Sequence, residues 1–350
     1  MSPDSTPADR AGAQERPRVA YLGPAGTFTE EALLAAVWRD SVEPVAARTI
    51  YETILALRRG EVDLSIVPIE NSLDGSITVT LDLLADEHAD LEIVGEELLT
   101  VRHSLIAARR VELAQIDTVL THPQVPGQCE RFLRGELGHA RVLAASSTAE
   151  AVRAAVGAGR PNEAALGTVL AAEIYGGVVL REGVQDRDDN ETRFVWLARS
   201  RAGGRAADSD ANGGTSSGPD HTADSGADRA VASLRFAQGE GDGWKTSLVF
   251  WGPGADSPGW LVRCLDEFSR RAINLTKIES RPKRERMGHY MFFVDLQGSV
   301  RDETVAQALA GLEAICEEAR VLGSYRAVAT AANAGGRGAA AVHCATSDGQ

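Results

Sequence analysis

The chain has 350 residues, of which 43% are hydrophobic and 25% charged, as is usual for a soluble globular protein. Its formal net charge of −14 argues against a nucleic-acid-binding protein, which needs a basic face, but permits a local basic pocket for a small anion. None of the four cysteines stands in a C-x-x-C pair, so the sequence predicts reduced thiols rather than a zinc cluster.

Three segments lack the large apolar residues that a folded core requires. Residues 1–17 are polar, with no apolar stretch typical of a secretion signal, and predict a disordered tail. Residues 201–243, rich in Gly, Ser, Ala and Asp at their start, predict a flexible linker, and residues 331–350 predict a second disordered tail. Two folded units remain, 18–200 and 244–330. The missing signal and the lack of any membrane-length apolar stretch predict a cytoplasmic location.

The first unit alternates short apolar strands with helical patterns, which predicts α/β layers with mostly parallel sheets. A capping-box spacing of Thr27 and Glu30 precedes the first helix. We expect strands at 18–23, 62–69, 116–122, 140–145 and 163–168, and helices at 27–38, 51–60 and 76–86.

Polar loops follow four of these strands, at 23–27, 68–76, 121–128 and 146–148. Each precedes an expected helix start, where free backbone N–H groups and the helix dipole favour an anion. A single Ser or Thr there is usually only a helix cap, but four such loops in one unit favour an anion pocket. Arg193 would supply its fixed positive charge by clamping a carboxylate.

Other motif interpretations fail on particular residues. The stretch 23–28 lacks the G-K-[ST] ending of a P-loop, and a calcium loop beginning at Asp186 has Glu191 in place of the required glycine. His122 precedes a proline and is interpreted as a turn residue. No cofactor motif, metal-ligand spacing or Ser-His-Asp arrangement is present, so no cofactor or metal is expected. A site of hydroxyls and amides favours electrostatic and general-acid chemistry.

The second unit shows the order β-α-β-β-α-β of a ferredoxin-like fold. Its strands are expected at 245–253, 275–282, 289–298 and 321–325. Its helices are expected at 258–274 and 303–319.

In this order and spacing, the motifs YLGPAGTFTEEAL, VPIENSLDGS, THPQVPGQC, SST and NETRF resemble the prephenate dehydratase family. The resemblance covers 18–200, and the second unit resembles an ACT regulatory domain. It implies an α/β fold with a two-lobed, periplasmic-binding-protein-like catalytic unit, in which the chain crosses between lobes near 100 and 183. It also implies conversion of prephenate to phenylpyruvate with loss of water and carbon dioxide, in phenylalanine biosynthesis.

The resemblance further assigns roles to residues. Thr192 is the expected catalytic residue, donating a hydrogen bond or a proton to the departing hydroxyl, and Glu70 is expected to orient that hydroxyl. Arg193 is expected either to bind a carboxylate or to form a salt bridge to nearby acids. The residues implied to bind the substrate are Thr27, Asn71, Ser72, Thr121, Gln128, Ser147, Thr148, Arg193 and Phe194.

In the ACT-like unit, the resemblance implies an allosteric site for phenylalanine as feedback inhibitor. Trp260 replaces a small residue of the family motif, and either fills part of that site, turns outward or packs against a partner chain. With the long linker, this predicts weaker or altered inhibition. The residues implied are Gly259, Trp260, Leu261, Val262, Asn274, Glu279, Ser280, Arg281 and Pro282.

Two alternatives stay open at this point. One is an enzyme that prefers arogenate, the aminated analogue of prephenate, and the other is a non-catalytic small-molecule-binding regulator. Family behaviour implies a homodimer or homotetramer, with no nucleic-acid or membrane partner.

Overall fold

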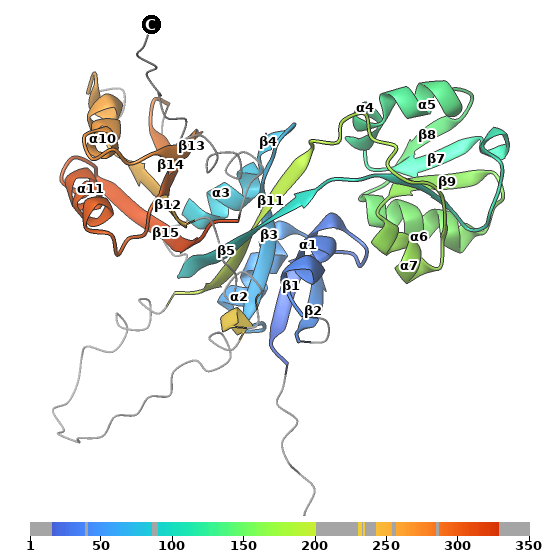
Figure 1. The fold of residues 1–350 in the computed structure, drawn as a ribbon, viewed down its shortest axis with the longest axis horizontal. Coiled ribbons are helices and arrows are strands. Elements are labelled where there is room, and N and C mark those ends of the chain that lie inside the picture. The colour runs from blue at the N-terminus through green and yellow to red at the C-terminus, as the bar shows by residue number, and fades with distance from the viewer. Residues whose placement is uncertain are drawn as a thin grey trace, which may run out of the picture. The chain divides into compact units, whose positions relative to one another are not determined.

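The computed structural model describes residues 16–38, 41–85, 90–200, 230–232, 234, 243–253, 257–284 and 287–328. Most of the expected tails and linker, at 1–17, 201–243 and 331–350, lies outside these ranges. The chain divides into two units (Figure 1). The first comprises Met1–Leu91 and Leu99–Arg235, and the second comprises Glu92–Leu98 and Phe236–Gln350. No helix in the described ranges is long and apolar enough to cross a membrane.

The first lobe of the first unit is built on a mixed sheet in the order β2-β1-β3-β11-β5, with β4 paired to β3. β1 pairs in parallel with β2 and β3, whereas β11 runs antiparallel to β3. The strands are β1 (Arg18–Leu22), β2 (Glu43–Ala47), β3 (Leu64–Asn71), β4 (Gly75–Ser76), β5 (Leu91–Thr100) and β11 (Glu191–Arg199).

Three helices accompany this sheet: α1 (Phe28–Ala36), α2 (Ile50–Arg58) and α3 (Thr78–Ala85). Thr27 caps α1 by accepting the Glu30 N–H at 3.4 Å, and Thr49 caps α2 by accepting the Glu52 N–H at 3.0 Å. Each cap satisfies a backbone donor that the helix itself cannot. The three expected helices are therefore confirmed. Each is shorter than expected by one or two residues at its ends, except that α2 begins one residue earlier.

The second lobe holds a sheet in the order β10-β6-β9-β7-β8. β7 runs parallel to β8 and β9, while β6 is antiparallel to β9 and to β10. The expectation of mostly parallel sheets is thus wrong, because β6 runs against the other strands of the second sheet and β11 runs against β3 in the first. The strands are β6 (Ser104–Ala107), β7 (Thr118–Thr121), β8 (Arg141–Ala144), β9 (Glu163–Gly167) and β10 (Val178–Arg181).

Helices cover both faces of this second sheet (Figure 1). The face under α5 buries Val119, Cys129 and Leu133, and the opposite face packs Ile106 and Ala165 against small residues of α6 and α7. Alanines on α6 let the helix approach the strands closely. The elements are η1 (Leu113–Gln115), α4 (Val125–Gln128), α5 (Glu130–Glu136), α6 (Thr148–Ala158) and α7 (Val169–Tyr175).

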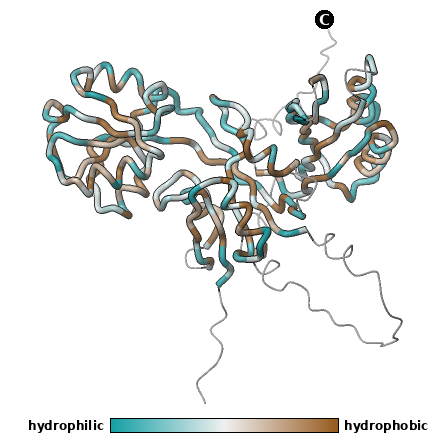
Figure 2. The backbone as a smooth tube through the Cα atoms, turned by 180° about the vertical axis from the view of Figure 1, so that it is seen from behind, coloured by the Kyte–Doolittle hydropathy of each residue, from teal (hydrophilic) through white to brown (hydrophobic). Residues whose placement is uncertain are grey.

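The second unit has the predicted β-α-β-β-α-β order, with an antiparallel sheet arranged β13-β14-β12-β15. Phe250, Phe268 and Leu312 are fully buried where the two helices pack on the sheet. Figure 2 shows hydrophobic residues concentrated along the strands. The elements are β12 (Trp244–Trp251), α10 (Trp260–Ser269), β13 (Leu275–Pro282), β14 (Tyr290–Gln297), α11 (Glu303–Glu313) and β15 (Glu318–Arg326).

Candidate active site

A cavity of about 350 Å³ lies in the first unit and is lined by residues from both lobes. The chain reaches it at the end of β1 and β3, between β5 and β6, after β7, before α6, and at the start of β11. Its polar lining consists of Thr27, Thr29, Asn71, Asp74, His103, His122, Gln124, Gln128, Ser146, Ser147, Thr148, Asn190 and Thr192.

Asn71 and Thr192 are paired across β3 and β11 at the mouth of this cavity. The Asn71 side-chain oxygen accepts the backbone N–H groups of Leu73 at 2.9 Å and Asp74 at 3.0 Å. Because backbone N–H groups only donate, this fixes which end of the amide is nitrogen. The Asn71 nitrogen then donates to Asn190 Oδ1 at 2.9 Å and to Thr192 Oγ1 at 3.0 Å. The Thr192 hydroxyl is therefore an acceptor for Asn71, and its own proton remains available to a ligand.

The neighbouring pair on the same two strands, Glu70 and Arg193, does not line the cavity. Arg193 is 7% exposed, and its guanidinium lies 3.6 Å from the Glu70 carboxylate. Adjacent residues of a strand point to opposite faces, so Asn71 and Thr192 take the cavity side and this ion pair the other. The expected contacts of Glu70 with the substrate hydroxyl and of Arg193 with its carboxylate stay predictions that this placement does not favour. The salt-bridge alternative for Arg193 is the one observed.

Three further expected binding residues also lie outside the cavity lining. Ser72 Oγ accepts the Glu191 N–H at 3.0 Å and so holds the β3–β4 turn against β11. The Thr121 hydroxyl is buried and donates to the Leu166 carbonyl at 3.1 Å. Phe194 is 1% exposed and packs in the core. These residues shape the site without touching its interior.

Two helices begin at the cavity. Thr27 caps α1 and donates its hydroxyl to the Leu22 carbonyl at 2.8 Å. Ser147 caps α6 by accepting the Glu150 N–H at 3.0 Å, and Thr148 is the first residue of that helix. Both helix starts expose backbone N–H groups and a positive dipole end, which favour a bound anion. Thr27, Ser147, Thr148 and Gln128 are thus brought together with Asn71 and Thr192 in one cavity.

Several lining residues were not predicted from the sequence, and His103 is the most buried of them, at 1% exposed. His103 Nε2 lies 2.9 Å from Gln128 Oε1, and its ring meets Phe28 edge-on at 5.4 Å between centroids. Burial lowers the pKa of His103 below its ordinary value of 6.5. His122, expected to be only a turn residue, also lines the cavity. His103 directly precedes the strand SLIA, and no motif or ligand spacing in the sequence marks it as a site residue.

The cavity holds a mostly neutral set of donors. No Lys or Arg belongs to its described lining, and Asp74 is its one carboxylate. Nor do three or more His, Cys, Asp or Glu side chains gather as a metal-binding group anywhere in the described ranges. An anion would therefore be held by hydroxyls, amides and helix N-termini, and a hydroxyl leaving group by a donor such as Thr192.

The loop between β1 and α1 joins the two lobes. The Tyr175 hydroxyl donates to the Ala25 carbonyl at 2.7 Å, and the Thr168 hydroxyl donates to the Gly26 carbonyl at 2.7 Å. Gly26 has φ +85°, and a Cβ there would come within 2.7 Å of Ala171 Cα. Only glycine lets this loop approach α7 so closely.

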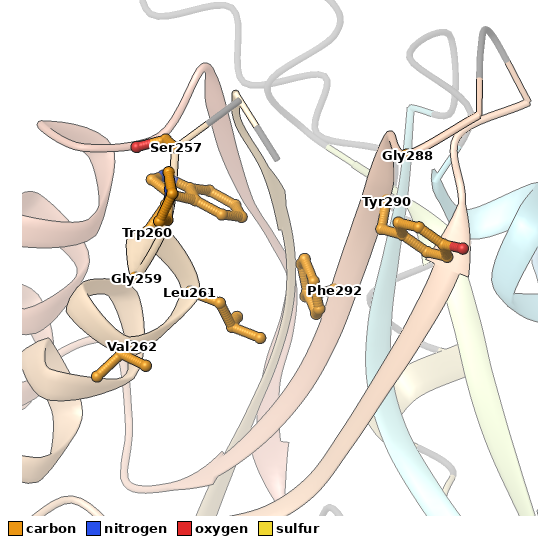
Figure 3. A pocket seen from close by; sticks show the side chains of 9 residues that line it. Ser257, Gly259, Trp260, Leu261, Val262, Gly288, Tyr290 and Phe292 are labelled. Carbon is orange, nitrogen blue, oxygen red and sulfur yellow. The ribbon is translucent and has the colours of Figure 1, made fainter. Parts of the chain in front are cut away.

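A second cavity, of about 420 Å³, lies in the second unit at the start of α10 (Figure 3). Gly259, Trp260, Leu261 and Val262 line it together with Tyr290 and Phe292 of β14 and residues 257, 258 and 288. Leu261 reaches toward Phe292, while Val262 is 70% exposed. The implied residues Glu279, Ser280, Arg281 and Pro282 lie on β13 outside this lining. Asn274 also lies outside it and donates to Gln297 Oε1 at 3.2 Å.

Trp260 turns inward rather than outward. It is 3% exposed, and its indole Nε1 donates to the Ile315 carbonyl at 2.8 Å. The ring packs against Phe250 and Phe292, with centroids 6.1 and 5.9 Å apart. Trp260 therefore forms the inner wall of the second cavity.

Comparison with known proteins now decides the family. The family model for prephenate dehydratase matches residues 19–202. The chain belongs to the prephenate dehydratase family. A prephenate dehydratase from Mycolicibacterium vanbaalenii is 36% identical over 322 residues, covering 88% of this chain and 91% of that protein.

Two solved structures resemble most of the chain. A prephenate dehydratase from Arthrobacter aurescens in complex with L-Phe has a TM-score of 0.71 and 32% identity, covering 88% of this chain and 90% of that one. The protein GqqA, described as a novel type of quorum-quenching acylase, has a TM-score of 0.68 and 27% identity, covering 89% and 98%. The likeness to prephenate dehydratase thus extends over both units, beyond the 19–202 match.

Proposed function

We propose that this protein catalyses the conversion of prephenate to phenylpyruvate, with loss of water and carbon dioxide, in phenylalanine biosynthesis. The observation that carries the proposal is the Asn71–Thr192 pair at the cavity. Asn71 occupies a lone pair of the Thr192 oxygen, which leaves the hydroxyl proton directed to a bound substrate.

The chemistry follows from charge and donors. Prephenate is a dianion whose ring hydroxyl must leave as water while its ring carboxylate leaves as carbon dioxide. The N-termini of α1 and α6 supply donors for the carboxylates. A hydrogen bond from Thr192 to the departing oxygen strengthens as negative charge develops there, and so acts mainly in the transition state. Threonine is too weak an acid to act by ionising, so the proton that completes the water comes from solvent and is relayed through the Thr192 hydroxyl.

Aromatisation of the ring drives the departure of carbon dioxide, so the chain's own residues need only bind, orient and donate. Exclusion of bulk water by the two lobes strengthens each of these hydrogen bonds. The Tyr175 and Thr168 contacts to residues 25 and 26 hold the cavity in this form.

The acylase described for GqqA offers a second activity to test. Acyl transfer by a hydroxyl nucleophile requires a general base within hydrogen-bond reach. Within the described residues, the hydrogen-bond partner of the Thr192 hydroxyl is Asn71, whose nitrogen is a donor and not a base. This arrangement suits hydrogen-bond donation by Thr192 and favours the dehydratase.

For the second unit, we propose an ACT-type regulatory role with phenylalanine as inhibitor, supported by the cavity at Gly259–Val262 and by the L-Phe complex of the Arthrobacter aurescens protein. We also propose cytoplasmic location and a homodimer or homotetramer. The exposed Val262 and Ile278 offer apolar area for self-association, which light scattering measures directly.

The test is turnover of purified full-length protein with prephenate, followed as phenylpyruvate, beside arogenate and with or without phenylalanine. Turnover of prephenate that phenylalanine inhibits supports the proposal. Faster turnover of arogenate under the same conditions would show that arogenate, and not prephenate, is the preferred substrate. Absence of turnover of both by folded protein contradicts a dehydratase.

A further inference from the structure

His103 is held rigidly beside Gln128 in the catalytic cavity. Its backbone N–H donates to Gln185 Oε1 at 3.1 Å, and its carbonyl accepts the Val184 N–H at 2.9 Å. The edge-on contact with Phe28 fixes the ring plane. The ring therefore presents Nε2 to Gln128 Oε1 at 2.9 Å with little freedom to turn.

The protonation state follows from this surrounding. Burial disfavours the charged imidazolium and lowers the pKa of His103, so the ring is neutral and carries one N–H. An amide oxygen only accepts, so that N–H lies on Nε2. Nδ1 is then a bare acceptor, and it has no hydrogen-bond partner among the described residues. The reversed amide would instead leave a buried N–H without an acceptor, which proteins rarely tolerate.

We propose that His103 is a positioning residue that binds the Gln128 carbonyl and thereby turns the Gln128 NH₂ group toward the substrate. With its oxygen held by His103, Gln128 has its two N–H donors left to face the cavity. Within the described lining, which contains no Lys or Arg, such a donor helps to hold a carboxylate. The expected change in KM rests on the proposed function. The tautomer of His103 does not depend on which substrate the protein binds.

The kinetic test compares His103→Phe, which keeps the ring shape, with His103→Gln, which restores a donor near the Nε2 position. We expect His103→Phe to raise KM for prephenate at least fivefold with kcat changed less than twofold, and His103→Gln to recover most of the loss. In a Gln128→Leu background, His103→Phe should have no further effect. His139→Phe, at an exposed position, is the control for the substitution itself.

An unchanged KM in folded His103→Phe, or additive effects in the double variant, overturns the positioning role. Nitrogen-15 NMR of labelled histidine provides the second measurement. A neutral ring protonated at Nε2 supports the proposal even if prephenate is not the substrate, and a ring protonated at Nδ1 or at both nitrogens overturns it.

A separate observation concerns two cysteines in the second unit. Cys264 Sγ lies 3.8 Å from Cys316 Sγ, between α10 and the segment that follows α11. To form a disulfide of about 2.0 Å, the sulfurs need to approach by about 1.8 Å. Cys264 is fully buried and Cys316 is partly exposed, so an oxidant reaches the pair from the Cys316 side.

The pair adjoins Trp260, which lines the second cavity, although neither sulfur belongs to that lining. Cys264 follows Trp260 by one turn on the same face of α10. Cys316 follows Ile315, whose carbonyl accepts the Trp260 indole N–H. A bond between the two sulfurs would therefore tie together both elements that position Trp260.

We propose that Cys264 and Cys316 form a reversible disulfide that changes the affinity of this cavity for its amino-acid effector. Hydrogen peroxide is the simplest oxidant: the two thiols and one peroxide give one disulfide and two waters. A dithiol reductant reverses the step. The consequence for inhibition rests on the proposed regulatory role, whereas formation of the disulfide does not.

Tryptic digestion without reductant separates the two claims, because Cys264 and Cys316 fall in different peptides, 264–270 and 302–320. We expect peroxide to link these peptides and to shift the midpoint of phenylalanine inhibition at least threefold, with dithiothreitol restoring both. Cys316→Ser should abolish the shift, and Cys129→Ser, at a buried and unpaired thiol, should retain it.

Failure to detect the linked peptide overturns the disulfide. A linked peptide with unchanged inhibition in a phenylalanine-sensitive enzyme overturns the coupling. If neither form responds to phenylalanine, the proposed regulation fails, and the peptide mass still decides the disulfide.

Discussion

The side-chain nitrogen of Asn71 lies 3.0 Å from the hydroxyl oxygen of Thr192 on the neighbouring strand. Because the Asn71 oxygen is occupied by two backbone N–H groups, the nitrogen can only be the donor in this contact. The relationship makes the Thr192 oxygen an acceptor and leaves its proton for a ligand, which supports the proposed role of Thr192 as a hydrogen-bond donor to the substrate.

Removing the Thr192 hydroxyl should abolish most of the catalysis. Thr192→Val keeps the shape of the side chain, so we expect kcat to fall by roughly 10²–10⁴-fold with a small change in thermal stability. Thr192→Ser keeps the hydroxyl and should retain more than a tenth of the activity. Similar losses in both variants would show that packing, rather than the hydroxyl, is what matters.

Reversing the direction of the hydrogen bond between residue 71 and Thr192 should also lower kcat, although Thr192 itself is unchanged. In Asn71→Asp, the carboxylate still accepts the N–H groups of Leu73 and Asp74, but its second oxygen draws the Thr192 proton away from the substrate. We expect kcat to drop at least about 100-fold while circular dichroism is unchanged. Activity near that of the wild type would refute the assigned direction of the hydrogen bond.

Glu70 should prove dispensable for the chemistry. Its carboxylate pairs with Arg193 at 3.6 Å and does not line the cavity. Glu70→Gln should lower kcat less than tenfold and reduce the free energy of unfolding by about 1 kcal/mol, because the pair is partly exposed. A kcat loss as large as that of Thr192→Val would restore a catalytic role for Glu70.

A side chain at position 26 should disturb the contact between the two lobes, whereas a side chain at position 75 should not. Both have positive φ, +85° and +80°, but only at Gly26 does a Cβ meet backbone, at 2.7 Å from Ala171 Cα. Gly75→Ala should lose only the strain of the left-handed backbone, about 1–2 kcal/mol. Gly26→Ala should lose more stability and also raise KM for prephenate, measured by thermal unfolding and steady-state kinetics. Equal behaviour of the two variants would argue against the contact.

Acid should destabilise the first unit partly through His103. Burial lowers the folded-state pKa of His103 below the ordinary value of 6.5, so the unfolded chain binds its proton first as pH falls. This contribution to stability is complete above pH 6.5 and is lost below it, by at most about 1.4 kcal/mol per pH unit. Urea unfolding of wild type and His103→Gln between pH 7.5 and 5.5 checks this, and a steeper loss in the variant would contradict it.

Local patterns in the sequence predicted much of this molecule. Capping spacings placed the start of α1, and the β-α-β-β-α-β order of the second unit emerged from period and turn signals alone. Loops at strand ends predicted a shared anion pocket, and the resemblance to the family named Thr27, Gln128, Ser147 and Thr148 within those loops. The motif around Thr192 identified the residue that now lies opposite Asn71.

Tertiary structure decided what each of these side chains touches. Whether Arg193 or Thr192 faces the cavity depends on the β3–β11 register, where a one-residue slip exchanges the faces of the strand. His103 gives no local signal, and the sequence left the placement of Trp260 open, since the contacts of these residues lie 25 and 55 residues away. Sequence by itself determined the elements and the set of candidate residues. Long-range strand pairing and burial alone decided which of them share a cavity, because spacing along the chain does not encode contacts between distant segments.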